Sequence, residues 1–130
     1  MTPINRSATL RTAVLLALGL ASLAAVHAQT IRVRCDTWGA TRSRASVDGA
    51  NLAGGAYTAV LTSAAHQATA ASQPAQQGVV QFDFDSKKSE IKDGATPIGK
   101  KFIVNDTATG TLVDASGTVV AQDTRMCKAH

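Results

Sequence analysis

The chain contains only two cysteines, Cys35 and Cys127. A disulfide that closes a loop of about 90 residues stabilises the folded state by about 4 to 5 kcal/mol in the chain-entropy treatment. Such a bond forms only if the two Cα atoms come within about 7 Å of each other. The first and last strands of the domain must then be neighbours, or must face each other across two sheets. No other feature of the sequence restricts the topology as strongly.

The N-terminal segment has the pattern of a secretory signal peptide. Two arginines precede an apolar run over residues 13–26, and a short cleavage motif of small or apolar residues ends at Ala28. The run is too short to span a bilayer comfortably, which takes about 20 residues. We therefore predict a signal peptide over residues 1–28, a single mature domain over residues 29–130, a periplasmic or secreted location and no membrane span after cleavage.

Export favours a disulfide, because exported proteins meet an oxidising environment. The alternative is a pair of free thiols, and a soft metal such as Cu(I) could then bind Met126, Cys127 and His130. The sequence has no Cys-x-x-Cys motif, and the soft-metal site would need Cys127 to be reduced. We predict a Cys35–Cys127 disulfide and no metal site.

Apolar and polar residues alternate with a period of two through most of the mature domain, which is typical of half-buried β-strands. The clearest strand covers residues 80–85, where Val80 and the two phenylalanines should face inward while Asp83 and Asp85 face outward. Further strands are expected within residues 31–35, 44–49, 57–63, 102–104, 111–113 and 118–122.

The last two of these segments flank a four-residue turn with Gly117 at its end, which predicts a β-hairpin. The sequence GTLVDASGTVVA, residues 110–121, resembles the G-x-V-x-D-x-x-G-x-x-V-x hairpin of prealbumin-like and carboxypeptidase-regulatory-like β-sandwich domains. Those families usually have a proline after the turn, where this chain has Thr118-Val119. The resemblance implies a sandwich and assigns no functional residue.

Short strands with frequent turns predict an all-β fold, a small antiparallel β-sandwich of the immunoglobulin or prealbumin-like kind. A small closed β-barrel would show the same alternation. Residues 64–78 contain Pro74 and lack an apolar face, so we expect a surface loop there. Residues 86–94 could hold one helical turn, with Asp85 or Ser86 as its cap and Gly94 as its stop.

The clearest candidate binding surface is formed by Arg32, Arg34, Arg42 and Arg44, the only charge cluster of one sign. Four guanidinium groups could bind a carboxylate- or phosphate-bearing partner, such as an anionic glycan or an acidic envelope protein. Trp38 beside them could stack on a sugar ring, although a single tryptophan more often plugs one end of the core. The alternative without a binding function is a solvated outer face whose charges keep an edge strand from pairing with another chain.

The acidic residues Asp83 and Asp85 could bind Ca²⁺ together with Glu90 and Asp93, since Ca²⁺ takes six to eight oxygen ligands. The spacing does not fit an EF-hand loop, because Lys87 stands where the third acidic ligand should be. We therefore expect a solvated strand face with ion pairs, and no cofactor.

Catalysis and nucleic-acid binding have little support. Residues 29–130 hold 11 basic and 9 acidic groups, which is too balanced for a nucleic-acid surface. Only His66 and His130 remain after the signal peptide, and the terminal His130 is expected to fray.

We predict a non-enzymatic accessory binding or structural module of the cell envelope. The alternative is an anion- or sugar-binding protein that uses the arginine face and Trp38.

Overall fold

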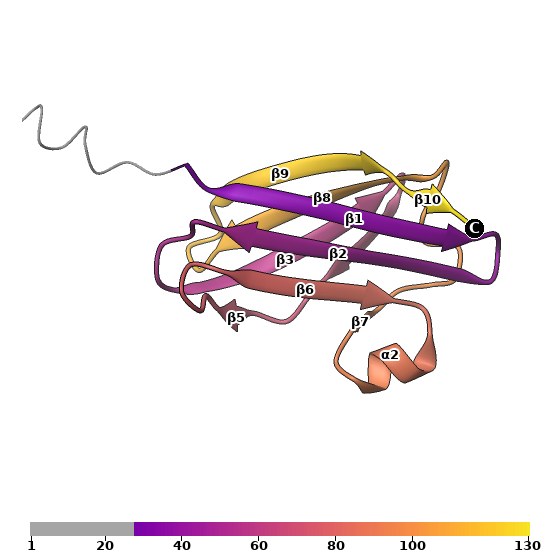
Figure 1. Cartoon of the computed structure of the whole chain (residues 1–130), viewed down its shortest axis with the longest axis horizontal. Helices are drawn as coiled ribbons and strands as arrows, with labels where there is room; N and C mark the ends of the chain where they lie inside the picture. Colours follow the sequence, from indigo (N-terminus) through magenta and orange to yellow (C-terminus); the bar gives the residue numbers. More distant parts are fainter. Residues whose placement is uncertain (1–27) are drawn as a thin grey trace, which may run out of the picture.

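Two antiparallel-rich β-sheets pack face to face in the computed structural model, which describes residues 28–130 (Figure 1). Sheet A has the strand order β10-β1-β2-β6-β7, and sheet B has the order β4-β3-β8-β9 with β5 beside β3. Sheet A consists of β1 (Thr30–Trp38), β2 (Arg42–Ala50), β6 (Val80–Asp85), β7 (Thr96–Pro97) and β10 (Lys128–Ala129). Sheet B consists of β3 (Ala56–Ser63), β4 (His66–Thr69), β5 (Gln73–Pro74), β8 (Thr107–Asp114) and β9 (Val119–Met126).

The fold is the predicted sandwich and not the closed barrel, because no strand pairing joins sheet A to sheet B within the described residues. A single short helix, α2 (Lys88–Lys92), lies in that range, and nothing there is a helix long and apolar enough to cross a membrane. The predicted signal peptide lies outside the described residues, except for Ala28.

The core lies between the two sheets and follows the predicted alternation. Val80, Phe82 and Phe84 are buried while Asp83 is exposed, as the sequence predicts. The sheets approach closely at Gly110, where a Cβ atom would lie 2.6 Å from Val33 Cγ2. A side chain at this position would therefore collide with the opposite sheet.

Asp85 lies on the outer face of sheet A, opposite Arg44, but the prediction that it is solvated is wrong, because its exposed fraction is 2%. After β6 the chain folds back along the end of the strand, where the backbone N–H of Ile98 donates to the Asp85 carbonyl at 3.1 Å. Arg42 and the N–H of Lys87 then hydrogen-bond the carboxylate. Alternation predicts the face of a residue within a strand, but it does not predict that a later part of the chain will cover that residue.

Three further local predictions need correction. Residues 64–78 do not form a plain loop, since β4 and β5 pair with β3, and Pro74 occupies an edge position that suits its missing N–H. Residues 102–104 form no strand, because only Val104 makes an isolated bridge with Thr107. Helix α2 is preceded by Lys87 without a side-chain cap, although Gly94 follows it with a positive φ.

The predicted hairpin is confirmed between β8 and β9. Gly117 has φ +88°, and its N–H donates to the Asp114 carbonyl at 3.0 Å. A bulge opposite Leu112 and Val113 then shifts the register of β9. Val119 becomes 57% exposed, and Val120 packs against the core instead.

The predicted disulfide is confirmed, and it lies where the chain passes from one sheet to the other. Cys127 is the single residue between β9 of sheet B and β10 of sheet A. Its Cα atom is 4.6 Å from that of Cys35 on β1. Next to it, β10 pairs with β1 in parallel, with Lys128 opposite Asp36. The bond therefore ties the last segment of the chain to the first strand.

Candidate functional site

The four arginines of the predicted cluster lie on one surface, the outer face of sheet A. In the antiparallel pair β1–β2, Arg34 lies opposite Ser46, Asp36 opposite Arg44 and Trp38 opposite Arg42. Residues opposite each other in a sheet share a face, and every second residue along each strand shares it too. The odd-numbered residues of both strands face the core, so the even-numbered ones face outward.

Acidic residues interleave with these arginines, so the outer face has mixed charge. A guanidinium nitrogen of Arg34 lies 3.0 Å from Asp48, which stands on the neighbouring strand. Arg42 binds both carboxylate oxygens of Asp85, at 2.9 and 2.5 Å. Two of the four arginine charges are thus compensated within the sheet.

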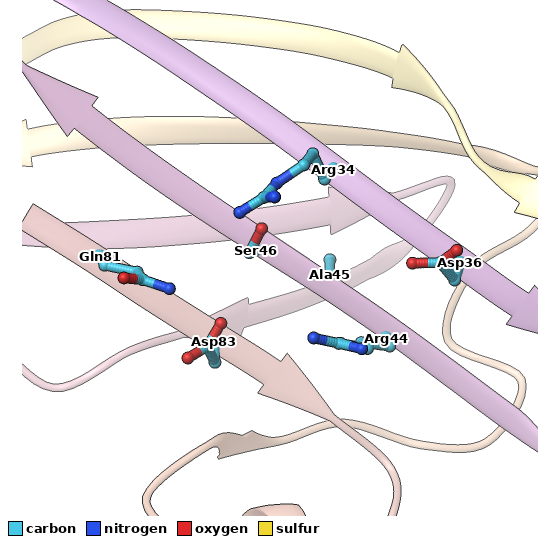
Figure 2. Close-up of a pocket in the computed structure, with 7 residues that line it drawn as sticks. All are labelled: Arg34, Asp36, Arg44, Ala45, Ser46, Gln81 and Asp83. Carbon is cyan, nitrogen blue, oxygen red and sulfur yellow. The ribbon is translucent and has the colours of Figure 1, made fainter.

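A pocket opens on this outer face across three strands, β1, β2 and β6 (Figure 2). It is lined by Arg34, Asp36, Arg44, Ala45, Ser46, Gln81 and Asp83. The structure thus brings two of the predicted site residues together here, and Arg32, Arg42 and Trp38 are not part of the lining.

Ser46 is the most buried polar residue among those that line the pocket, with an exposed fraction of 7%. Arg34 lies beside it on the neighbouring strand β1, and Arg44 stands two residues before it on β2 itself (Figure 2). Within residues 28–130, Arg44 takes part in no ion pair. No carboxylate in this range therefore engages its guanidinium group at ion-pair distance, although Asp36 and Asp83 line the same pocket. Sequence reasoning missed Ser46 and Gln81, because neither residue type stands out without the strand register.

Trp38 does not plug the core, since it is half-buried on the outer face of sheet A. The His130 ring stacks on it with centroids 4.5 Å apart and an interplanar angle of 8°. The Arg42 Cζ atom lies 4.6 Å from the centroid of the same ring. Because β10 and β2 flank β1 on opposite sides, His130 and Arg42 approach opposite faces of the indole. Both contacts occupy indole surface that a stacked sugar ring would need.

His130 is held in place, and the expectation that it frays is wrong. Its backbone N–H donates to the Thr37 carbonyl at 2.9 Å, and its Nε2 lies 2.9 Å from the Asp36 carboxylate. The signal that could have predicted this contact is Cys127, three residues earlier, which the disulfide fixes beside β1.

The Arg42–Asp85 pair is the most buried ion pair among the described residues, with side-chain exposures of 21% and 3%. Burial alone would raise the pKa of Asp85. The hydrogen bonds from Arg42 and from the Lys87 N–H, together with the charges of Arg42 and Arg44, outweigh burial and hold that pKa below its usual value. The hydrogen bond to Asp85 likewise raises the pKa of Arg42.

The candidate metal ligands are not brought together. Within the described residues, no group of three or more His, Cys, Asp or Glu side chains could hold a metal ion. Asp85 is engaged by Arg42, whereas Asp83 lines the pocket. Cys127 is oxidised in the disulfide, and His130 stacks on Trp38.

The remaining histidine, His66, has a structural contact as well. Its Nδ1 lies 2.7 Å from the Phe102 carbonyl oxygen, so the ring nitrogen donates to this acceptor. The two rings also lie against each other in a tilted arrangement, with centroids 5.5 Å apart.

Comparison with known proteins adds nothing to this geometry, since no family model, curated protein or solved structure matches the chain.

Proposed function

We propose that this chain is an exported, non-enzymatic binding module of the cell envelope. In this proposal the outer-face pocket binds a ligand that carries a carboxylate or phosphate group. The observation that carries the proposal is that Arg34 and Arg44 line one pocket together with the buried Ser46, Arg34 from β1 and Arg44 from β2 (Figure 2). A planar guanidinium presents its N–H donors in a fork that matches two oxygens of a carboxylate or phosphate.

The other lining residues make the pocket selective and not simply attractive to anions. Ser46 and Gln81 offer neutral hydrogen-bonding groups, whereas Asp36 and Asp83 place negative charge at the rim. Arg34 is already paired with Asp48, and Asp36 and Asp83 offset the charge of Arg44, so long-range attraction is weak. Binding therefore depends on a ligand that seats its anionic group between the guanidinium groups and keeps it away from the carboxylates.

Export and the absence of catalysis are parts of the same proposal. The Cys35–Cys127 disulfide supports an oxidising compartment. Both histidines of the described residues are engaged in structural contacts, His66 with Phe102 and His130 with Trp38 and Asp36, which supports a binding role over acid–base chemistry. We leave sugar stacking on Trp38 out of the proposal, because His130 and Arg42 cover its ring.

Titration calorimetry of the exported protein with acetate and with inorganic phosphate tests the proposal, with urea as an uncharged control. We expect binding of at least one anion, and a loss of about tenfold or more in affinity for Arg44→Gln, since charge-assisted hydrogen bonds contribute about 1.5 to 3 kcal/mol. Arg32→Gln removes the same charge from the same face outside the pocket and should change little. Equal losses in both variants, or binding of neither anion, would refute the pocket assignment.

A further inference from the structure

The net positive charge of the domain is concentrated in one short segment between β6 and β8. Residues 87–101 contain five lysines against Glu90 and Asp93, a net charge of +3. The rest of residues 29–130 contains six basic and seven acidic groups, a net charge of −1. We call this segment the lysine lobe; its lysines are Lys87, Lys88, Lys92, Lys100 and Lys101.

All five lysines of the lobe are exposed. None of them takes part in an ion pair within the part of the chain that the structure describes. Lys88 and Lys92 stand four residues apart on α2, and residues at this spacing share one side of a helix. The lobe therefore presents several uncompensated positive charges to the outside, in contrast to the mixed charges on the outer face of sheet A.

The lobe is anchored to the sandwich at both of its ends, so its backbone has a fixed place. At its start, the backbone N–H of Ser86 donates to the Ser43 carbonyl at 3.1 Å. At its end, the buried Ser43 hydroxyl donates to the Lys100 carbonyl at 2.9 Å and accepts from the Ile103 N–H at 3.3 Å. Phe102, with 7% exposure, inserts into the core beside this contact. Figure 1 shows the resulting loop with α2 projecting beyond the edge of the sandwich.

We propose that the lysine lobe docks the protein onto the anionic phospholipid headgroups of a membrane surface. Lysine ammonium groups are compact point charges, which suit a fluid layer of headgroups better than one ligand of fixed shape. No described pocket collects these lysines; the pocket lined by His66, Gly99, Lys101 and Phe102 contains one of them.

The proposed contact is electrostatic and does not insert side chains into the bilayer. The large apolar side chains exposed in the described chain are Val79, Val119 and Met126, and all three lie outside the lobe. Each lysine near an anionic membrane surface contributes about a fivefold gain in affinity, and the effect is screened by salt. This inference concerns a different surface from the pocket and stands whether or not the pocket binds anions.

Vesicle sedimentation of the exported protein tests the proposal. The vesicles contain either phosphatidylcholine alone or phosphatidylcholine with about a third of phosphatidylglycerol, at low and at physiological salt. We expect binding to the anionic vesicles only, and weaker binding at the higher salt. The triple variant Lys88→Gln, Lys92→Gln, Lys101→Gln should lose about a hundredfold in affinity, since each lysine contributes about fivefold.

The matched control removes three positive charges elsewhere, by Arg32→Gln, Arg125→Gln and Lys128→Gln. This variant has the same net charge as the lobe variant and should retain most of the binding. Equal losses in the two variants would show that net charge alone drives adsorption and would overturn the proposal. Equal binding to neutral vesicles, or to neither kind, would overturn it too. Tighter binding to a soluble polyanion such as dextran sulfate than to the vesicles would assign the lobe to a polymer instead of a membrane.

Discussion

The His130 ring lies parallel to the Trp38 ring at a centroid distance of 4.5 Å, although the two residues stand near opposite ends of the domain sequence. The contact depends on β10, which pairs with β1 directly after the disulfide. Asp36 fixes the imidazole from the same strand that carries the tryptophan. The end of the chain thus completes the outer face of sheet A.

The stack makes Trp38 a reporter of the C-terminal segment. His130→Ala should uncover one face of the indole and shift its fluorescence emission to longer wavelength. The loss of the aromatic contact should lower the free energy of unfolding by about 0.5 to 1.5 kcal/mol. Lys128→Ala, two residues earlier and exposed, is the control and should leave the emission unchanged. Identical emission spectra of His130→Ala and the unsubstituted protein would contradict the stack.

Reduction of the Cys35–Cys127 bond should lower the free energy of unfolding by about 2 to 5 kcal/mol, because the reduced unfolded chain regains its loop entropy. Thermal melts with and without reductant measure the loss, and non-reducing peptide mapping verifies the covalent link. The same reduction should loosen β10 and shift the Trp38 emission. An unchanged melt after verified reduction would show that the bond does not stabilise the fold.

Asp85 should make stability depend on acid pH. Because its pKa in the folded protein lies below the ordinary value, its contribution is present above that ordinary value and is lost as pH falls through the folded pKa. Asp85→Asn should lower the free energy of unfolding at neutral pH by about 2 to 3 kcal/mol, since Arg42 loses a buried charged acceptor. The difference from the unsubstituted protein should shrink below about pH 4.

Denaturant unfolding at a series of pH values measures this difference. Asp83→Asn is the matched control, because Asp83 is an exposed aspartate two residues away on the same strand. It should change stability by less than about 0.5 kcal/mol. A constant difference between Asp85→Asn and the unsubstituted protein from neutral to acid pH would rule out the ionised Asp85 as its source.

Gly110→Ala should destabilise the sandwich by overpacking. The new methyl group would meet Val33 Cγ2 at 2.6 Å and Val47 Cγ2 at 2.8 Å, both on the opposite sheet. Forcing such a group into a packed core costs about 1 to 3 kcal/mol. Gly99→Ala is the control, since no atom lies within 4 Å of its added Cβ. Equal melting temperatures for the two variants would show that the sheets can separate to accept the methyl group.

Export is testable by intact-mass analysis of the secreted or periplasmic protein. We expect a chain that begins at Gln29, with or without cyclisation of this residue to pyroglutamate. The expectation rests on the apolar run and the cleavage motif at Ala28. A mass that retains residues 1–28 would exclude cleavage at this site.

Local alternation made much of the fold predictable. A strand side chain points to one face or the other with a period of two, so the inward positions of Val80, Phe82 and Phe84 follow from the sequence alone. The hairpin between β8 and β9 follows from Gly117. The connection between the first strand and the end of the chain follows from two cysteines near the ends of the domain. The four arginines were also readable as a cluster, since each pair shares a strand face.

The tertiary structure alone decided what surrounds those side chains. Asp85 is buried because the chain returns over the end of β6, and local pattern carries no information on that return. The pairing of β1 with β2 and β6 placed Arg34, Arg44 and Ser46 around one pocket. Arg42 was instead taken into the ion pair with Asp85. Within a regular strand, the sequence by itself determined which face a residue occupies, because that is a local property of the strand. Strand register and the path of the chain after β6 decide which residues meet on that face. Both are set by contacts between distant parts of the sequence.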